Sequence, residues 1–170
     1  MKEEPTAAVP MATPRTIGET RTVVQRIMMP MDANPSGNVY GGSILKYIDE
    51  VASMVAFRHT RTNVVTASID RMDFLAPMHV GDFLILRAAI NYTGRTSMEV
   101  GVRVEAENPR TGHVVHAGSC YLTMVALGSD GRPAAVPPVS PSNDEERAWF
   151  ENGRRRREER LRVRERLGQD

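Results

Sequence analysis

The chain has 170 residues, enough for one domain with tails, and its 41% of hydrophobic residues can form a core. A net charge of +1 argues against a basic nucleic-acid-binding surface, and we expect neither a membrane span nor a signal peptide, because no apolar run is long enough. Cys120 is the only cysteine, which excludes an intramolecular disulfide. We expect a buried, inert thiol and a reducing, cytoplasmic compartment.

The first half of the chain changes pattern three times. Residues 1–20 are rich in Ala, Pro and Thr without periodicity, which predicts a disordered tail. Weak alternation predicts a strand over 22–29, and a cluster of turn-forming residues predicts a loop over 31–40. Apolar residues then recur at i, i+4, i+7, i+8 and i+11 over 41–58, which predicts an amphipathic helix.

After this helix the hydrophobic period becomes two. The alternation predicts strands over 64–74, 81–91 and 97–106, and a last strand that ends near Leu127. Strands of about 11 to 14 residues are roughly twice the usual length. Long antiparallel strands after one early helix predict an α+β fold in which a single curved sheet wraps around that helix. Because one helix cannot cover such a sheet and its edges stay open, we expect a homo-oligomer that forms through the sheet.

The C-terminal part has a different composition from this domain, which spans 21–132. A Pro-rich linker over 133–141 leads to a charged segment over 142–170. Ser142, three residues before Glu145, predicts a capped helix start. Eight arginines from Arg154 to Arg166 are interleaved with glutamates, and i, i+4 pairs between them favour a solvated helix over a nucleic-acid-binding arm.

Asp49 is the first candidate for chemistry. It lies two turns inside the predicted helix, beside the apolar Leu45 and Ala52. A partly desolvated carboxylate on such a stripe is the better general base. The alternative is a surface acid paired with Lys46, three residues earlier.

Two further groups precede Asp49 at the start of the helix and in the loop. Gly41 and Gly42 lack side chains, so a ligand can approach backbone N–H groups that have no partner inside the helix. Such donors can hold a carbonyl oxygen that becomes an oxyanion, although a Gly-Gly pair can equally serve close packing. Asn34 could donate its amide to the same oxygen or position a water, while Asn-Pro also favours an Asx-turn.

The spacing of these groups predicts where they act. Gly42 and Asp49 are seven residues apart, so about 10 Å separates them along one helix. That distance is too long for both to act on one carbonyl carbon. If both are used, the acid and the helix start must come from different protomers, and the site lies at a dimer interface.

Other catalytic constellations are missing from the sequence. It contains no G-x-S-x-G, no H-E-x-x-H, no P-loop and no G-x-G-x-x-G. The four histidines show no metal-ligand spacing with cysteine or acids. A serine-triad hydrolase and a metalloenzyme are therefore disfavoured, and we expect no metal.

These motifs together closely resemble the hotdog-fold acyl-CoA thioesterases, in the subgroup of brain-type acyl-CoA hydrolase and bacterial YciA. The P-x-D-x-N-x-x-G-x-x-x-G-G element with the later I-D-E is specific in combination, and the resemblance covers roughly 23–141. The segments that carry it are Arg26 to Asp49, Arg58-His59, Val64-Val65-Thr66, Asp73-Phe74-Leu75-Ala76-Pro77-Met78, Val80-Gly81-Asp82, Thr93-Gly94-Arg95-Thr96-Ser97 and Val136-Pro137-Pro138.

The resemblance implies hydrolysis of a fatty acyl-CoA thioester to free acid and CoA. The working pair of the family maps onto Asn34 and Asp49, which come from different hotdog units. Asp49 would act as general base on water, while Asn34 and the N–H groups near Gly41 and Gly42 polarise the carbonyl. No dissociable cofactor is needed.

The resemblance also implies a CoA site and an assembly. Positive charge must hold the CoA phosphates. The candidates for CoA binding are Arg58, Thr66, Arg71, Arg95, Thr96 and Ser97. The family commonly forms hexamers as trimers of dimers, so we expect the same of this chain.

Two other classes of hotdog protein are alternatives. One is a non-catalytic acyl-CoA-binding or regulatory protein, and the presence of both Asn34 and Asp49 argues against it. The other is a dehydratase, which usually offers a histidine with an acid at its site. No histidine lies in the loop or in the helix before Arg58, which counts against the dehydratase.

Overall fold

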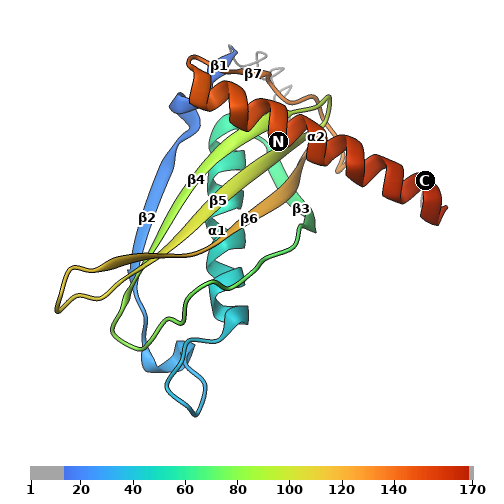
Figure 1. The fold of residues 1–170 in the computed structure, drawn as a ribbon. Helices are drawn as coiled ribbons and strands as arrows, with labels where there is room; N and C mark the ends of the chain where they lie inside the picture. The colour runs from blue at the N-terminus through green and yellow to red at the C-terminus, as the bar shows by residue number, and fades with distance from the viewer. Residues whose placement is uncertain (1–13, 169–170) are drawn as a thin grey trace, which may run out of the picture.

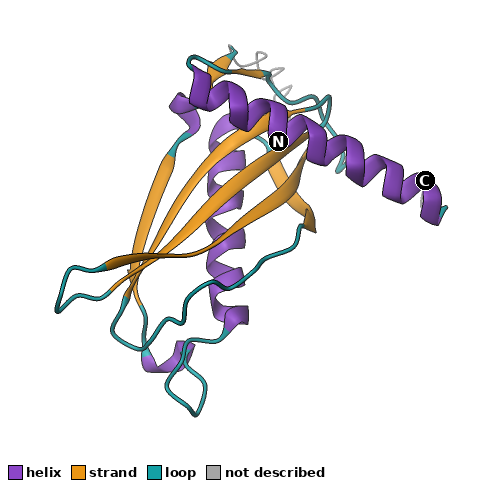
Figure 2. Cartoon of the chain, viewed as in Figure 1, coloured by secondary structure: helices purple, strands orange, loops and turns teal. Residues whose placement is uncertain are grey.

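A curled five-stranded antiparallel sheet wraps around one long helix in the computed structural model, which describes residues 14–168 (Figure 1). The strand order is β2 (Thr22–Ile27), β4 (Phe83–Thr93), β5 (Ser97–Glu107), β6 (Val114–Leu127) and β3 (Asn63–Ile69). The helix α1 (Gly41–Thr60) lies against one face of this sheet (Figure 2). The curved sheet around one helix that the sequence predicts is confirmed.

The core lies between α1 and the sheet. Ile48 on the helix and Val100 and Leu122 on β5 and β6 are fully buried. Apolar residues at helical spacing on α1 therefore meet apolar residues at every second position of the strands, as both periodicities predict. The helix begins after Tyr40 and ends at Thr60, and the next residue, Arg61, adopts the left-handed conformation at φ 58°.

The predicted strand over 64–74 is too long, because β3 ends at Ile69. Beyond it, the N–H groups of Asp70 and Leu75 still donate to the carbonyls of Tyr121 and Ala117 on β6. The six residues from Asp70 to Leu75 thus lie opposite the five from Ala117 to Tyr121, so regular pairing is lost and the chain runs as a loop to β4. This loop returns beside the start of α1.

The N-terminal prediction is also corrected in part. Residues 14–20 are ordered: β1 (Arg15–Thr16) pairs in parallel with β7 (Val139–Ser140), and the 3-10 helix η1 (Gly18–Thr20) follows. Ile17 anchors this segment, since its side chain is fully buried. The linker over 133–141 consequently contains a strand. Residues 1–13 of the predicted tail lie outside the described residues.

The C-terminal helix α2 (Asp144–Leu167) crosses the face of the sheet opposite α1 (Figure 1). Its cap is Asn143, whose side chain accepts from the Glu146 N–H at 2.9 Å, so the predicted cap at Ser142 is one residue early. The Glu146 carboxylate accepts from the N–H and the hydroxyl of Ser142 instead. The carboxylate is buried, and this explains why the capping pattern shifts by one residue.

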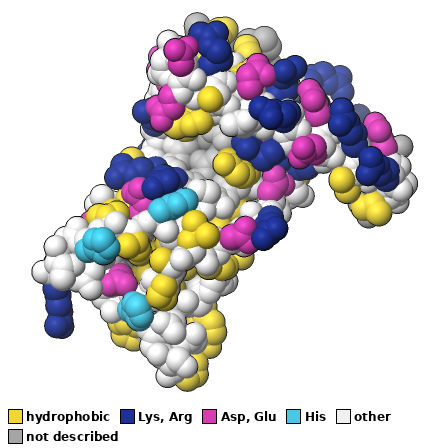
Figure 3. Space-filling view, in the orientation of Figure 1, with side chains coloured by type: hydrophobic (Ala, Val, Ile, Leu, Met, Phe, Trp, Pro, Cys, Tyr) yellow, Lys and Arg dark blue, Asp and Glu magenta, His cyan; other side chains and the backbone are white. Residues whose placement is uncertain are grey.

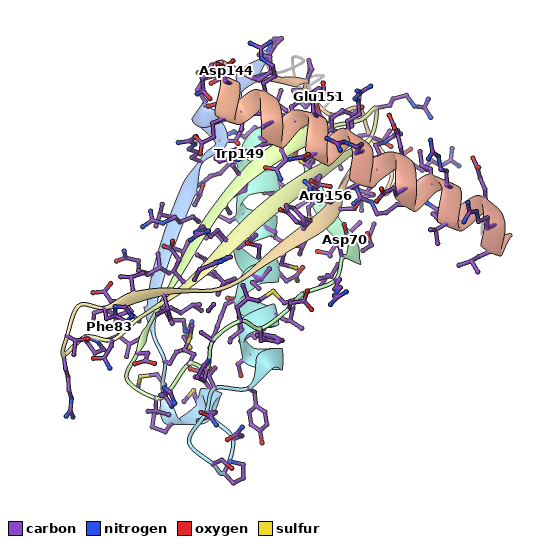
Figure 4. The ribbon with its side chains drawn as sticks, viewed as in Figure 1. Asp70, Phe83, Asp144, Trp149, Glu151 and Arg156 are labelled. Atoms are coloured by element: carbon purple, nitrogen blue, oxygen red, sulfur yellow. The ribbon has the colours of Figure 1, made fainter. Side chains whose placement is uncertain are left out.

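The helix α2 is not uniformly solvated. Trp149 and Arg156 lie on the side that faces the sheet (Figure 4). Arg156 and Arg160 both contact Glu99 on β5, and Arg160 also contacts Asp70 at the end of β3. The last turns, by contrast, are exposed.

Candidate active site

Asp49 projects from the middle of α1 toward the edge strand β3. Its Oδ1 accepts a hydrogen bond of 2.5 Å from the hydroxyl of Thr66, and its side chain is half-buried. Lys46 pairs with Glu50 at 3.6 Å, so the alternative in which Lys46 neutralises Asp49 is wrong. From the part of the chain that the structure describes, the Asp49 carboxylate accepts one hydrogen bond, from a neutral donor, which leaves lone pairs for a ligand or a water.

Asn34 lies in the loop between the 3-10 helix η2 (Pro30–Asp32) and α1. Its side-chain oxygen accepts from the N–H groups of Ser36 and Asn38, at 2.9 and 3.2 Å, which is the Asx-turn expected of Asn-Pro. Because these donors identify the oxygen, the amide nitrogen is the other end of the side chain. Within residues 14–168 this NH₂ group has no partner, so it remains a donor. The turn and the donor role are therefore compatible.

The two glycines at the start of α1 are not equivalent. A Cβ atom at Gly41 would lie 2.9 Å from the ring of Phe74, which is too close, so Gly41 serves close packing. Nothing lies within 4 Å of the position a side chain at Gly42 would take. Neither N–H has a partner among the described residues, since the first bonds to Tyr40 come from Ser43 and Ile44. Gly42 therefore offers an N–H that a ligand can approach.

The single chain keeps these groups apart. Asn34 lies beside the start of α1, because the Tyr40 N–H donates to the carbonyl of Asp32, two residues before it. Asp49 follows two turns later in an uninterrupted helix, about 10 Å along its axis. Among the described residues no hydrogen bond joins Asn34 to Asp49.

The predicted CoA-binding residues are distributed over three places. Thr66 and Met98 flank Met124 in register, so Ser97 and the turn with Arg95 and Thr96 lie about two strand spacings, roughly 10 Å, from Thr66. Arg58 is exposed on the last turn of α1. Arg71 follows β3 and pairs with Asp73 at 2.9 Å, in full solvent contact. In the described part of the chain no ion pair or hydrogen bond links the three arginines.

A hollow lies on the face of the sheet opposite α1, beneath α2 (Figure 3). Its volume is about 590 Å³, and Arg87, Arg103 and Trp149 are among its lining residues. No predicted site residue lines it. Each guanidinium in it is already paired with a carboxylate, as Arg87 and Arg103 are with Glu105 at 2.8 Å. The predicted catalytic residues Asn34, Gly42 and Asp49 lie in or beside α1, away from this hollow.

The described residues offer no other kind of site. No group of three histidine, cysteine or acidic side chains there could hold a metal ion. Burial raises the pKa of the Cys120 thiol to about 11, so it stays protonated. Neither α1 nor α2 combines the length and hydropathy needed to cross a bilayer.

Comparison with known proteins identifies the family. The model of the thioesterase superfamily matches residues 36–113. YkhA of Bacillus subtilis, an uncharacterized acyl-CoA thioester hydrolase, is 41% identical over 138 residues, which make up 80% of this chain and 80% of that protein. The chain belongs to the thioesterase superfamily. The resemblance that the sequence motifs carry is thereby confirmed.

Solved structures of this superfamily share the fold. An apo-hexameric acyl-CoA thioesterase matches with a TM-score of 0.84 at 41% identity, over 89% of this chain and 97% of that one. The acyl-CoA hydrolase of Staphylococcus aureus, in complex with butyryl coenzyme A, coenzyme A and coenzyme A disulfide, gives a TM-score of 0.84 at 35% identity, over 91% and 94%. The hotdog fold is confirmed.

The Staphylococcus aureus hydrolase has also been solved with an asparagine, an aspartate and a threonine each replaced by alanine. These three residues are 15 and 17 positions apart in its chain. Asn34, Asp49 and Thr66 have the same two spacings.

The sequence reasoning missed two relationships. Thr66 is a direct partner of Asp49, whereas its only predicted role was in CoA binding. Asp32 and Tyr47 were not singled out, although they form a buried hydrogen bond. The sequence did contain a signal for Asp32. It is the acid of P-x-D-x-N, two residues before Asn34, in a segment otherwise composed of turn-forming residues.

Proposed function

We propose that the protein hydrolyses acyl-CoA thioesters to a free acid and CoA, at sites that each combine residues from two copies of the chain. The observation that carries the proposal is the hydrogen bond between Thr66 and Asp49, which holds a carboxylate at the open edge of the sheet. The shared spacing of Asn34, Asp49 and Thr66 with the three substituted residues of the Staphylococcus aureus hydrolase supports it.

The chemistry requires only water and the thioester. Asp49 takes a proton from a water whose oxygen attacks the carbonyl carbon. The amide of Asn34 and the N–H of Gly42 hold the carbonyl oxygen while it carries negative charge. The carbon–sulfur bond then breaks, and Asp49 returns the proton to the CoA thiolate. No metal or cofactor takes part.

Two copies are needed because one helix separates the donors from the base by about 10 Å. In the described chain β3 pairs on one side only, with β6, so its other edge offers unpaired N–H and C=O groups. Val65 and Ile69 on β3 are 42% and 45% exposed, and Phe57 on α1 is 51% exposed. A second copy docked along β3 would cover these apolar side chains and bring its Asn34 loop toward Asp49.

The assembly and the CoA contacts extend this proposal. An acyl-CoA thioesterase of similar structure is hexameric, and we expect a trimer of such dimers here. The exposed arginines Arg58, Arg71 and Arg95 would hold the CoA phosphates, with Thr96 and Ser97 contributing hydroxyl groups.

Thiol release from a panel of acyl-CoA chain lengths tests the catalytic assignment. Asp49→Ala should lower kcat by about 10²-fold or more, the scale of a lost acid–base group. Glu50→Ala is the matched control, because it removes the neighbouring acid on the solvent side of the same helix, and it should retain activity. Unchanged turnover in Asp49→Ala would contradict the role of Asp49. If the wild type released no thiol from any acyl-CoA, a non-catalytic acyl-CoA-binding module would be favoured instead.

The same assay tests whether the site is shared between copies. Asn34→Ala and Asp49→Ala are each expected to lose most of the activity alone, with a residual turnover that can still be measured. When the two variants are co-expressed, half of the dimers hold one intact site out of two, so activity should return to about a quarter of the wild-type value. No recovery in purified mixed oligomers would place both residues of a site on one chain.

A further inference from the structure

Asp32 is a buried acid in the loop that leads to Asn34. Its side chain is 4% exposed, although it belongs to the short 3-10 helix η2 at the surface end of the sheet. A carboxylate at such a position is costly unless hydrogen bonds replace its water. The polar groups around Asp32 therefore indicate what it is used for.

Every polar group of Asp32 has a partner. Its carboxylate accepts from the Tyr47 hydroxyl at 2.5 Å and from the Met29 N–H at 2.9 Å. Its carbonyl accepts from the Tyr40 N–H at 2.9 Å and lies 3.3 Å from the hydroxyl of Ser43. One residue thus links the end of β2, the start of α1 and the second turn of α1.

The link to Tyr47 is charge-assisted. Burial alone would raise the pKa of Asp32, but hydrogen bonds from Tyr47 and Met29, together with the charge of Arg26, hold that pKa below its ordinary value. The hydrogen bond to Asp32 raises the pKa of Tyr47. At neutral pH the pair is a carboxylate and a phenol, and such bonds are about twice as strong as neutral ones. The Arg26 guanidinium lies 4.1 Å from the centre of the Tyr47 ring and completes the cluster.

The loop beyond Asp32 is internally closed. The Asn34 N–H donates to the Asn38 carbonyl at 2.8 Å, and Ala33 pairs with Val39. The far side of the loop is attached to the segment before β4, where the Val39 N–H donates to the carbonyl of Met78. The loop is therefore closed by its own hydrogen bonds, and Asp32 attaches it to α1.

The attachment joins the two groups that must act together. In the proposed reaction the Asn34 amide and the Gly42 N–H hold one carbonyl oxygen, so the loop and the helix start must keep a fixed separation. A misplacement of about 1 Å can cost about 10²-fold in rate. Asp32 lies two residues before Asn34 and accepts from Tyr40 and Tyr47, on either side of Gly42.

We propose that Asp32 and Tyr47 are positioning residues for acyl-CoA hydrolysis, and that their hydrogen bond sets the distance between the Asn34 amide and the N-terminus of α1. This inference rests on the proposed function, because it requires both donors to act on the substrate carbonyl. Neither residue touches the substrate.

A double-mutant cycle between Tyr47→Phe and Asn34→Ala tests the proposal. Tyr47→Phe removes only the hydroxyl and should lower kcat about 10-fold, with KM changed less than about twofold, because the CoA contacts are untouched. In the Asn34→Ala background the same substitution should have little further effect on kcat, since the group it positions is gone. Asp32→Asn, which cannot accept from both donors, should reproduce the loss.

Tyr92→Phe is the matched control, because it removes a hydroxyl from a ring that packs on Phe150, away from α1. It should leave kcat unchanged, and all variants should keep the oligomeric state and a cooperative unfolding transition. Normal kcat in Tyr47→Phe would overturn the positioning role alone, provided that Asn34→Ala is impaired. An equal loss in both backgrounds would also overturn it, since the effect would not pass through Asn34. Normal kcat in Asn34→Ala would overturn the role of Asn34 in the proposed function, and this inference with it.

Discussion

The helices α1 and α2 pack against the same strands from opposite faces, but the side chains at the two contacts differ in kind. Toward the sheet α1 presents Ile48, Val51 and Val55, which are at most 2% exposed. The contact of α2 with the other face is ionic. Arg156 and Arg160 lie 2.6 and 3.2 Å from the carboxylate of Glu99, whose side chain is 1% exposed. Val100, the next residue after Glu99, belongs to the apolar face.

This difference shows how one sheet can carry two kinds of contact. Apolar burial on the α1 side is non-directional and contributes about 25 cal/mol for each Å² removed from water. The ionic contact of α2 stabilises less, because two charges lose hydration, but it sets the position of the helix through directed hydrogen bonds. The first contact therefore builds the core, and the second orients an added helix and the end of β3.

The largest expected effect is on the apolar side. Ile48→Ala removes a fully buried side chain under the sheet and should lower the free energy of unfolding by about 2 to 5 kcal/mol, as transfer and cavity costs add. Urea denaturation at fixed protein concentration measures it. Lys46→Ala, on the exposed side of the same helix, is the control. A loss below about 1 kcal/mol for Ile48→Ala would mean that α1 is not the main source of stability.

A smaller effect is expected on the ionic side. Glu99→Ala leaves two guanidinium groups without their buried partner and should lower the free energy of unfolding by about 2 kcal/mol, since both arginines are about a quarter exposed and keep some hydration. Raising the NaCl concentration should reduce the difference in free energy of unfolding between Glu99→Ala and the wild type. The difference between Ile48→Ala and the wild type should not change. Glu151→Ala, which breaks an exposed pair with Arg154, should be nearly neutral. If the two variants responded identically to salt, the contact of α2 with the sheet would not differ in kind from the apolar contact of α1.

The smallest effect concerns a buried polar contact at the C-terminal end of α1. His59 Nε2 lies 2.7 Å from the Pro137 carbonyl, and Nδ1 has no partner among the described residues. Burial, with the nearby charge of Arg15, lowers the pKa of His59 below its ordinary 6.5. Below pH 6.5 His59 is therefore protonated in the unfolded chain but stays neutral in the folded chain until its lowered pKa is reached. The free energy of unfolding falls as pH drops through this range, by at most about 1.4 kcal/mol per pH unit.

Chemical denaturation between pH 7.5 and 5.5 measures this slope. His59→Gln retains a donor for the Pro137 carbonyl and removes the titration, so its slope should be shallower than that of the wild type. An unchanged slope would mean that other groups cause the acid sensitivity.

Local patterns were sufficient for most of the fold. Helical spacing from Ile44 to Val55 predicted α1, and alternation predicted β4, β5 and β6, because a residue on these elements has the same kind of neighbour every turn or every second position. The predicted end of β3 was wrong, because the hydrophobic alternation continues past Ile69 while the regular pairing with β6 stops there. Ile17 was assigned to a disordered tail because a single apolar residue among polar ones has no period.

For the candidate site, residue types were predictable and their partners were not. Asn34, Gly42 and Asp49 stand in a recognisable order, and the family confirmed by comparison follows from them. Thr66 as the partner of Asp49, and Tyr47 as the partner of Asp32, join segments 17 and 15 residues apart. No spacing rule relates such positions, because the distance between them is set by how α1 lies in the sheet.

The sequence by itself therefore determined most of the elements, the family and the residue types able to do chemistry, since each depends on short-range periodicity or on a compact motif. Only the tertiary structure decided that Gly42 is open while Gly41 is covered by Phe74, and that β3 leaves an edge beside Asp49. It alone decided that α2 is held by Glu99. These outcomes depend on packing between segments far apart in the chain, where one side chain excludes or completes another.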